Sequence, residues 1–112
     1  MKRSITTEAD LNTVSTAVNP TRNGSTLTIA IIGRFDFNCH QAFRRAYEGF
    51  DGIDQYLINL ANADYIDSSA LGMLLLLREN VGTRGVVKIV NPTPAVRRIL
   101  EIANFQRLFP LG

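Results

Sequence analysis

Short apolar runs alternate with longer segments of helical periodicity along this chain. Leu27, Ile29 and Ile31 share one face of residues 26–32, and threonines occupy part of the other face. This alternation predicts a β-strand. Similar apolar runs predict three further strands, at 14–18, 56–60 and 86–90. The turn-forming residues at 19–24 predict that the first two strands form an antiparallel hairpin.

Two amphipathic helices are predicted from apolar residues spaced three and four apart. The first covers residues 41–50, where the expected buried face is Ala42, Phe43, Ala46, Tyr47 and Phe50. The segment 33–36 is expected to end the preceding strand, and Asn38 is expected to cap the helix. The second helix is expected to start at Pro94, with Thr93 as its cap. Its expected buried face is Val96, Ile99, Leu100 and Ala103.

A third helix, predicted at 68–81, is apolar on nearly all sides. Such a helix must be buried or must contact another surface. The residues expected to line the face toward the sheet are Ala70, Leu71, Leu74, Leu75 and Arg78. Met73 or Leu76 is then left over for a partner, although burial of both under a neighbouring helix fits the pattern equally well.

The predicted order is strand, strand, helix, strand, helix, strand, helix. Two consecutive β-helix-β units imply right-handed crossovers and parallel strand pairs. We therefore expect an α/β fold whose mixed sheet combines an N-terminal antiparallel hairpin with parallel strands and packs with three to four helices. The domain is expected to span residues 14–112, after a flexible, polar N-terminal extension at residues 1–13.

The segment 65–72 joins an apolar run to a helix through one acid and two adjacent serines. Asp67 or Ser68 is suited to be the N-cap, because a short side-chain oxygen accepts the unpaired N–H groups of the first turn. Gly72 costs roughly 1 kcal/mol relative to alanine in a helix, which suggests a close approach by a partner or by a neighbouring element. Taken alone, these residues favour an ordinary helix cap.

A phosphate on Ser68 would change the surface and leave the fold standing. It adds about −1.5 to −2 charges at pH 7, beside the positive end of the helix dipole, which tolerates an anion. A partner packed against the uncharged helix end would instead meet a bulky dianion next to Asp67. The segment is therefore also suited to be a regulatory switch.

Composition narrows the function classes. The chain has 112 residues, enough for one domain, and its 46% apolar and 20% charged residues are typical of a soluble globular protein. The net charge of +2 gives no argument for nucleic acid or for a membrane surface. Cys39 is the only cysteine, so a reducing cytoplasm is the expected location. No apolar run approaches the roughly 20 residues that a membrane-spanning helix needs, so membrane insertion is not expected.

The sequence offers little for catalysis, metal binding or cofactor binding. Cys39 and His40 are adjacent, but neighbouring helical residues point about 100° apart, and no acid is placed to orient a nucleophile-base dyad. Phosphotransfer to Asp36, as in a receiver domain, lacks the second acid that such a site needs. The chain contains no Gly-rich loop ending in Gly-Lys-Ser/Thr and no recognisable metal-ligand spacing. We therefore expect no enzymatic activity, no cofactor and no metal.

Five segments in this order resemble the STAS domain of bacterial anti-sigma factor antagonists. They are 33–36 after the hairpin, 56–60 as the central strand, 67–72 at the start of the leucine-rich helix, 86–90 and 94–100. The resemblance covers residues 26–109. Its most specific element is the Asp-Ser-Ser sequence between an apolar strand and a leucine-rich helix. Ala70 departs from the family pattern, in which glycine is common after the paired serines.

The resemblance implies a partner-switching protein. In that family the unphosphorylated antagonist binds an anti-sigma factor, often also a serine kinase of the histidine-kinase-like ATPase class, and thereby frees a sigma factor. Phosphorylation blocks this binding, and a PP2C-type phosphatase restores it. No direct contact with nucleic acid is implied.

The family motif also assigns roles to residues of this chain. The first hydroxyl after the acid is the phosphosite, which here is Ser68, with Ser69 as the alternative. Asp36 matches the family's acid at the end of the hairpin and is expected on the same rim as Ser68. The expected partner-binding residues are Asp36, Asp67, Ser69, Leu71, Gly72 and Met73.

Other STAS relatives serve in transporters and lipid-trafficking complexes. The alternative function is therefore a subunit of such a complex that uses the same helix as a constitutive docking surface. This alternative predicts co-purification with membrane components and no phosphate on Ser68.

Overall fold

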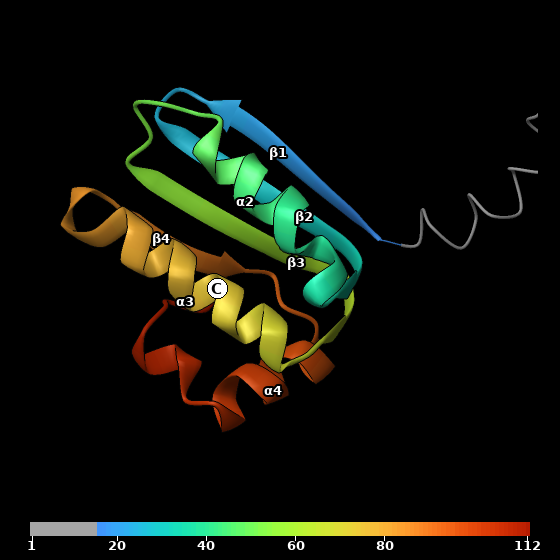
Figure 1. Ribbon diagram of the computed structural model, residues 1–112. Helices are drawn as coiled ribbons and strands as arrows, with labels where there is room; N and C mark the ends of the chain where they lie inside the picture. Colours follow the sequence, from blue (N-terminus) through green and yellow to red (C-terminus); the bar gives the residue numbers. More distant parts are fainter. Residues whose placement is uncertain (1–15) are drawn as a thin grey trace, which may run out of the picture.

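The computed structural model describes residues 16–112, which form a four-stranded sheet with helices packed on it (Figure 1). The strands lie in the order β1 (Ala17–Asn23), β2 (Thr26–Phe35), β3 (Gln55–Ile66) and β4 (Val86–Val90). β1 and β2 are antiparallel, and the other two pairs are parallel. The α-helices of this part of the chain are α2 (His40–Glu48), α3 (Ser68–Val81) and α4 (Pro94–Ile102). The predicted single α/β domain with a mixed sheet is confirmed, and the extension expected at 1–13 lies outside the described residues.

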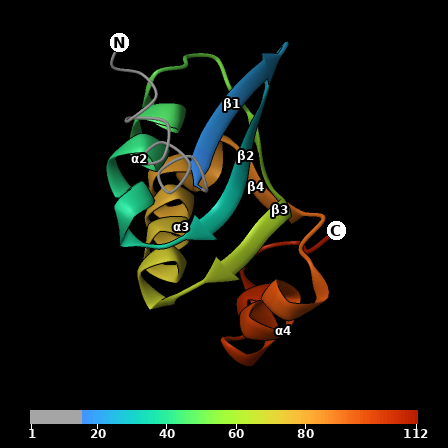
Figure 2. The ribbon, with the colours of Figure 1, turned by 90° about the vertical axis from the view of Figure 1, so that its right-hand side faces the viewer.

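The main core lies between the sheet and two helices. α2 and α3 lie side by side on one face of the sheet, and α4 lies on the other side of β3 (Figure 2). The predicted alternation of β2 is confirmed, because the side chains of Leu27, Ile29 and Ile31 are fully buried. The residues that α3 buries are Ala70, Met73, Leu74, Leu77 and Val81. The alternation of β2 therefore sets which face of the sheet receives the helices.

The first hairpin turns later than the sequence pattern predicts. The segment 19–24 was expected to be the turn, but β1 runs through Pro20 to Asn23, and only Gly24 and Ser25 form the turn. A proline is tolerated there because β1 is an edge strand of the sheet, and one side of its backbone needs no ladder partner. The strand expected at 14–18 overlaps β1 only at residues 17 and 18, and residues 14 and 15 lie outside the described part.

β2 and β3 are longer than predicted. Their extra length places Asp36 and the Asp67-Ser68-Ser69 sequence at the same edge of the sheet. The expected strand break at 33–36 does not occur, because β2 continues to Phe35 past Gly33, which has a φ of 85° beside a register shift. β3 likewise continues to Ile66. Phe35 and Ile66 are partners in the parallel ladder, so both strands end level with one another.

The start of α2 also differs from the prediction. Asn38 does not cap the helix; its N–H instead donates to Asp36 Oδ1 at 2.9 Å, which caps a 3-10 turn at Phe37–Cys39 ahead of α2. Ala42 is exposed, whereas the other residues expected on the buried face are buried or, for Phe50, half-buried. The helix thus begins within one residue of its predicted start, but Cys39 and not Asn38 occupies the N-cap position.

The C-terminal elements are mostly as predicted. Thr93 caps α4, because its Oγ1 accepts the N–H of Val96 at 3.2 Å, and Pro94 is the first helical residue. Ala103 is exposed, which contradicts its place on the expected buried face. β4 occupies the predicted range 86–90 and is the second edge of the sheet. A short C-terminal tail covers only part of this edge, through a bridge between Ile89 and Leu111.

Candidate functional site

Two carboxylates lie where β2 and β3 leave the sheet. Asp36 and Asp67 directly follow the paired residues that end these strands. Each carboxylate caps the turn after it: Asp36 Oδ1 accepts the N–H of Asn38 at 2.9 Å, and Asp67 Oδ1 accepts the N–H of Ala70 at 3.0 Å. We call Asp36, Asp67 and Ser68 the acid rim. The structure thus brings Asp36 and Ser68 to one edge of the sheet, as the sequence predicts.

Ser68 is the first residue of α3 and is exposed. The sequence left Asp67 and Ser68 open as the cap, and the structure assigns the cap to Asp67. Within residues 16–112, the hydroxyls of Ser68 and Ser69 have no hydrogen-bond partner, and Ser69 is half-buried. The Ser68 hydroxyl is therefore accessible and is not needed to hold the first turn.

The outer face of α3 carries a stripe of residues at a spacing of four. Ser68, Gly72 and Leu76 lie along it, and residues four apart in a helix are neighbours on its surface. The Leu76 side chain is 55% exposed, and a Cβ built on Gly72 meets nothing within 4 Å. We call these three residues the outer stripe. No neighbouring element in the described part of the chain explains the small size of Gly72.

Three residues of α3 differ from expectation. Met73 was named as a partner-binding residue, with Leu76 as the other candidate for an exposed contact, but Met73 is only 5% exposed, because it faces the core between α2 and α3. Leu75 and Arg78 were expected to pack on the sheet, but both are exposed. A helix that is apolar nearly all round does not reveal its buried side through periodicity alone. Leu71 is half-buried and packs against the core.

An arginine and a tyrosine beside the acid rim were not singled out from the sequence. Arg34 and Tyr65 are partners across the β2–β3 ladder, and the Arg34 guanidinium lies 4.2 Å from the centre of the Tyr65 ring. Arg34 Nε also donates to Asp36 Oδ2 at 3.4 Å. Both side chains are exposed. The predicted strands at 26–32 and 56–60 end before Arg34 and Tyr65. The sequence therefore provides no register from which to pair these two residues.

The cysteine and histidine next to the rim do not form a dyad. The Cys39 thiol donates to the carbonyl of Arg34 at 3.2 Å, and the His40 ring instead stacks on Phe37, with ring centres 5.3 Å apart. Burial raises the pKa of the Cys39 thiol; a hydrogen bond with the Asp36 backbone opposes this, and the carboxylates of Asp36 and Asp67 raise the pKa further. A thiol held in its protonated form is a poor nucleophile.

Other kinds of site find little support in the described part of the chain. Residues 16–112 contain no group of three or more His, Cys, Asp and Glu side chains that could hold a metal ion. None of the helices in this range is both long and apolar enough to cross a membrane. A hollow among these residues lies away from the acid rim, near the last turn of α3. Within the rim, Ser68 is exposed, whereas Asp36 and Asp67 are half-buried.

Comparison of this sequence with known proteins finds the STAS domain in two ways. The sequence model of the STAS domain matches residues 17–112. A STAS-domain containing protein of Pseudomonas aeruginosa (strain UCBPP-PA14) is 50% identical over 95 residues, which are 83% of this chain and 94% of that protein.

Solved structures of similar fold include two anti-sigma factor antagonists. The one from Mycobacterium paratuberculosis superposes with a TM-score of 0.76 at 21% identity, covering 87% of this chain and 85% of the other. SpoIIAA of Bacillus, in its unphosphorylated form, superposes with a TM-score of 0.74 at 19% identity, covering 86% and 88%. A structure of phosphorylated SpoIIAA also matches, with a TM-score of 0.62 at 17% identity, covering 86% and 91%. At these identities the matches show a common fold.

Proposed function

We propose that this chain, which belongs to the STAS domain family, is an anti-sigma factor antagonist whose binding is switched by phosphorylation of Ser68. In this proposal the unphosphorylated chain sequesters an anti-sigma factor or a histidine-kinase-like serine kinase, and a PP2C-type phosphatase restores the binding form. The observation that carries the proposal is the division of roles at the start of α3. Asp67 caps the helix, and Ser68 stands exposed beside it.

The greater exposure of Ser68 supports Ser68 over Ser69 as the phosphosite. A kinase must reach the hydroxyl, and Ser68 is exposed whereas Ser69 is half-buried. A phosphate at the first helical position lies where the backbone N–H groups and the helix dipole favour an anion. The fold therefore tolerates the modification, and its main effect falls on whatever binds the rim.

The outer stripe supports a partner surface next to that phosphosite. Leu76 offers an exposed apolar contact, and Gly72 lets another backbone or side chain approach the helix closely. Leu76 replaces Met73 as the apolar contact of the proposed surface. Asp67 and Ser69 adjoin Ser68 in the chain, Asp36 lies at the same edge of the sheet, and Leu71 packs against the core beneath the helix.

Electrostatics at the acid rim explains how a phosphate would release the partner. Asp67 is adjacent to Ser68, and the exposed cation nearest to Asp36 in the ladder, Arg34, is already engaged by Asp36 and Tyr65. A phosphate would therefore add about −1.5 to −2 charges to a rim that is already acidic. A partner that packs apolar surface there would have to desolvate this charge, which is costly without a counter-charge.

Affinity purification from the native cell, followed by phosphosite mass spectrometry, tests the proposal. Ser68→Ala should retain the anti-sigma factor constitutively, Ser68→Asp should retain at least tenfold less, and Ser69→Ala should behave as the unmodified chain. Far-ultraviolet circular dichroism and melting curves of each variant check that all are folded. Equal retention of membrane transport components by Ser68→Ala and Ser68→Asp, without phosphate on Ser68, would instead support the constitutive docking function.

A further inference from the structure

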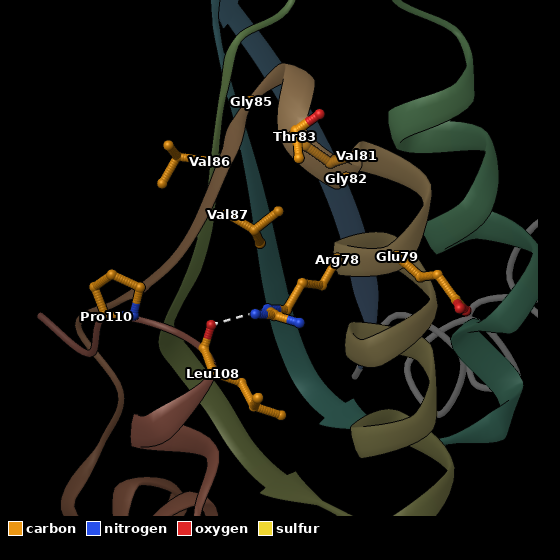
Figure 3. Close-up of a pocket in the computed structure, with 10 residues that line it drawn as sticks. All are labelled: Arg78, Glu79, Val81, Gly82, Thr83, Gly85, Val86, Val87, Leu108 and Pro110. Atoms are coloured by element: carbon orange, nitrogen blue, oxygen red, sulfur yellow. Dashed lines mark hydrogen bonds between the residues drawn. The ribbon is translucent and has the colours of Figure 1, made fainter.

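A hollow in the described part of the chain lies at the end of α3 that is remote from Ser68, and Figure 3 shows the residues that line it. It has a volume of about 490 Å³ and lies between the last turn of α3, the start of β4 and tail residues Leu108 and Pro110. We call it the β4 groove. The 14 residues of α3 separate it from the acid rim by about 20 Å, at 1.5 Å per helical residue. It is therefore a different surface from the one proposed for the anti-sigma factor.

The strand edge that borders the β4 groove has unpaired backbone groups. The N–H of Val86 donates toward the β3 side at 3.0 Å, whereas the N–H and C=O of Ile89 bond the tail at 3.0 and 2.8 Å. Successive residues of a strand direct their backbone groups to opposite edges, so Val87 faces the same side as Ile89. Within residues 16–112, no strand pairs with Val87 on that side.

The side chains around this edge form an apolar lining. Figure 3 shows the Val87 side chain directed toward α3 and the Val86 side chain directed the opposite way. Val81 and Val87 are buried, and Leu108, which is 38% exposed, lies on the side of the tail. An added strand could therefore place alternate aliphatic side chains against this lining, while its backbone pairs with Val87.

The β4 groove carries a cation without a carboxylate partner. Arg78 Nε donates to the carbonyl of Leu108 at 3.0 Å, which fixes the guanidinium at the mouth of the groove (Figure 3). Glu79 also lines the groove, but its carboxylate points away in Figure 3. Among residues 16–112, no carboxylate lies within ion-pair distance of Arg78. Of the two charged residues that line the groove, Arg78 is the one directed at its mouth, so this position favours an acidic group of a ligand.

We propose that the β4 groove binds an extended, acidic peptide segment of a partner protein by strand addition to β4. The segment pairs with the backbone of Val87, places an aliphatic side chain in the hollow and places a carboxylate on Arg78. Main-chain pairing supplies affinity in this mode, and the pockets for alternate side chains supply specificity. The C-terminal tail shows that this edge accepts a strand, because it already pairs with Ile89.

Nuclear magnetic resonance titration of the isotope-labelled full chain tests the proposal. The probe is a capped heptapeptide that alternates glutamate and valine. We expect saturable shifts at Gly85, Val87, Arg78 and Leu108, with no shift at Ser68. Two matched peptides serve as controls: one alternates lysine and valine, and one carries an N-methyl group at its central residue. Both should bind at least fivefold more weakly than the probe.

Two charge variants separate the role of Arg78 from the general positive charge. Arg78→Gln should raise the dissociation constant of the probe at least fivefold, whereas Arg98→Gln, on α4, should change it less than twofold. Equal binding of the three peptides, or saturable shifts confined to other surfaces, would overturn the proposal even if Arg78→Gln failed to fold. Concentration-dependent broadening at Val87 without peptide would show a second copy of the chain on this edge, and would also overturn it.

Discussion

Asp67 Oδ1 accepts the backbone N–H of Ala70 at 3.0 Å, which makes Asp67 the residue that holds the first turn of α3. Asp67→Ala should therefore lower the free energy of unfolding by about 1 kcal/mol, the usual cost of losing an N-cap. Ser68→Ala should change it by less than about 0.5 kcal/mol, as for other surface substitutions. Urea denaturation followed by circular dichroism measures both. A larger loss for Ser68→Ala than for Asp67→Ala would contradict this assignment of the cap.

Substitution of Gly72 should have opposite effects on the stability of the free chain and on its affinity for a partner. Because a Cβ at this position meets nothing within 4 Å, Gly72→Ala should stabilise the free chain by up to about 1 kcal/mol through helix propensity. The same methyl group lies on the outer stripe, so it should weaken anti-sigma factor binding. Thermal unfolding of the free chain and titration with the captured partner give the two quantities. Unchanged affinity would remove Gly72 from the partner surface.

Gly85 is expected to behave in the opposite way. A Cβ at Gly85 would lie 2.8 Å from the backbone oxygen of Asp54, and neither backbone segment moves freely, because the N–H of Val86 donates to that same oxygen. Gly85→Ala should therefore destabilise the fold by about 1–3 kcal/mol, as overpacking generally does. Chemical denaturation measures it, with Gly72→Ala as the matched substitution at an open position. A neutral result at Gly85 would show that the start of β4 adjusts easily.

The Cys39 thiol should be slow to react and should affect stability at alkaline pH. Burial raises its pKa in the folded chain, so the unfolded chain loses the thiol proton first as the pH rises past about 8.5, the ordinary value for a thiol. The folded state then binds more protons than the unfolded state, and the free energy of unfolding falls with pH. Its contribution is fully present below that value and is lost as the pH rises through the folded pKa.

Comparison of the unmodified chain with Cys39→Ala tests whether the thiol makes the free energy of unfolding fall as the pH rises. The unmodified chain should lose more stability between pH 8 and 10 than the variant, and a disulfide reagent should label Cys39 much more slowly in buffer than in denaturant. Rapid labelling of the folded chain at pH 7 would show an accessible thiolate instead.

The pattern of apolar and polar residues predicts which helices and strands occur more accurately than it predicts where each one begins and ends. The α3 helix occurs at 68–81 as expected, because a strong run of helix formers follows a capping acid. The ends of β1 and β2 were missed because their location depends on tertiary context. Pro20 is acceptable only on an edge strand, and Gly33 continues a strand only where its neighbour accommodates a register shift. The order of the strands in the sheet determines where β1 and β2 end, and the local residue pattern does not reveal that order.

The sequence likewise predicts one part of the candidate site and misses another. The juxtaposition of Asp36 and Ser68 followed from the rule that parallel strands end at a common edge, and the structure shows it. The buried side of α3 did not follow, because leucines surround the helix and only the position of α2 decides that Met73 is covered and Leu76 is not. The β4 groove was missed for a similar reason, since it depends on where the C-terminal tail leaves the edge of β4.

The most direct test of the switch compares the chain in two chemical states that differ only at Ser68. Titration calorimetry with the captured anti-sigma factor measures the dissociation constant of the unphosphorylated chain and of the chain stoichiometrically phosphorylated at Ser68. We predict that phosphorylation raises the constant at least tenfold, or about 1.4 kcal/mol, while the unfolding midpoint of the chain changes little. Equal dissociation constants for the two folded forms would contradict the proposed function.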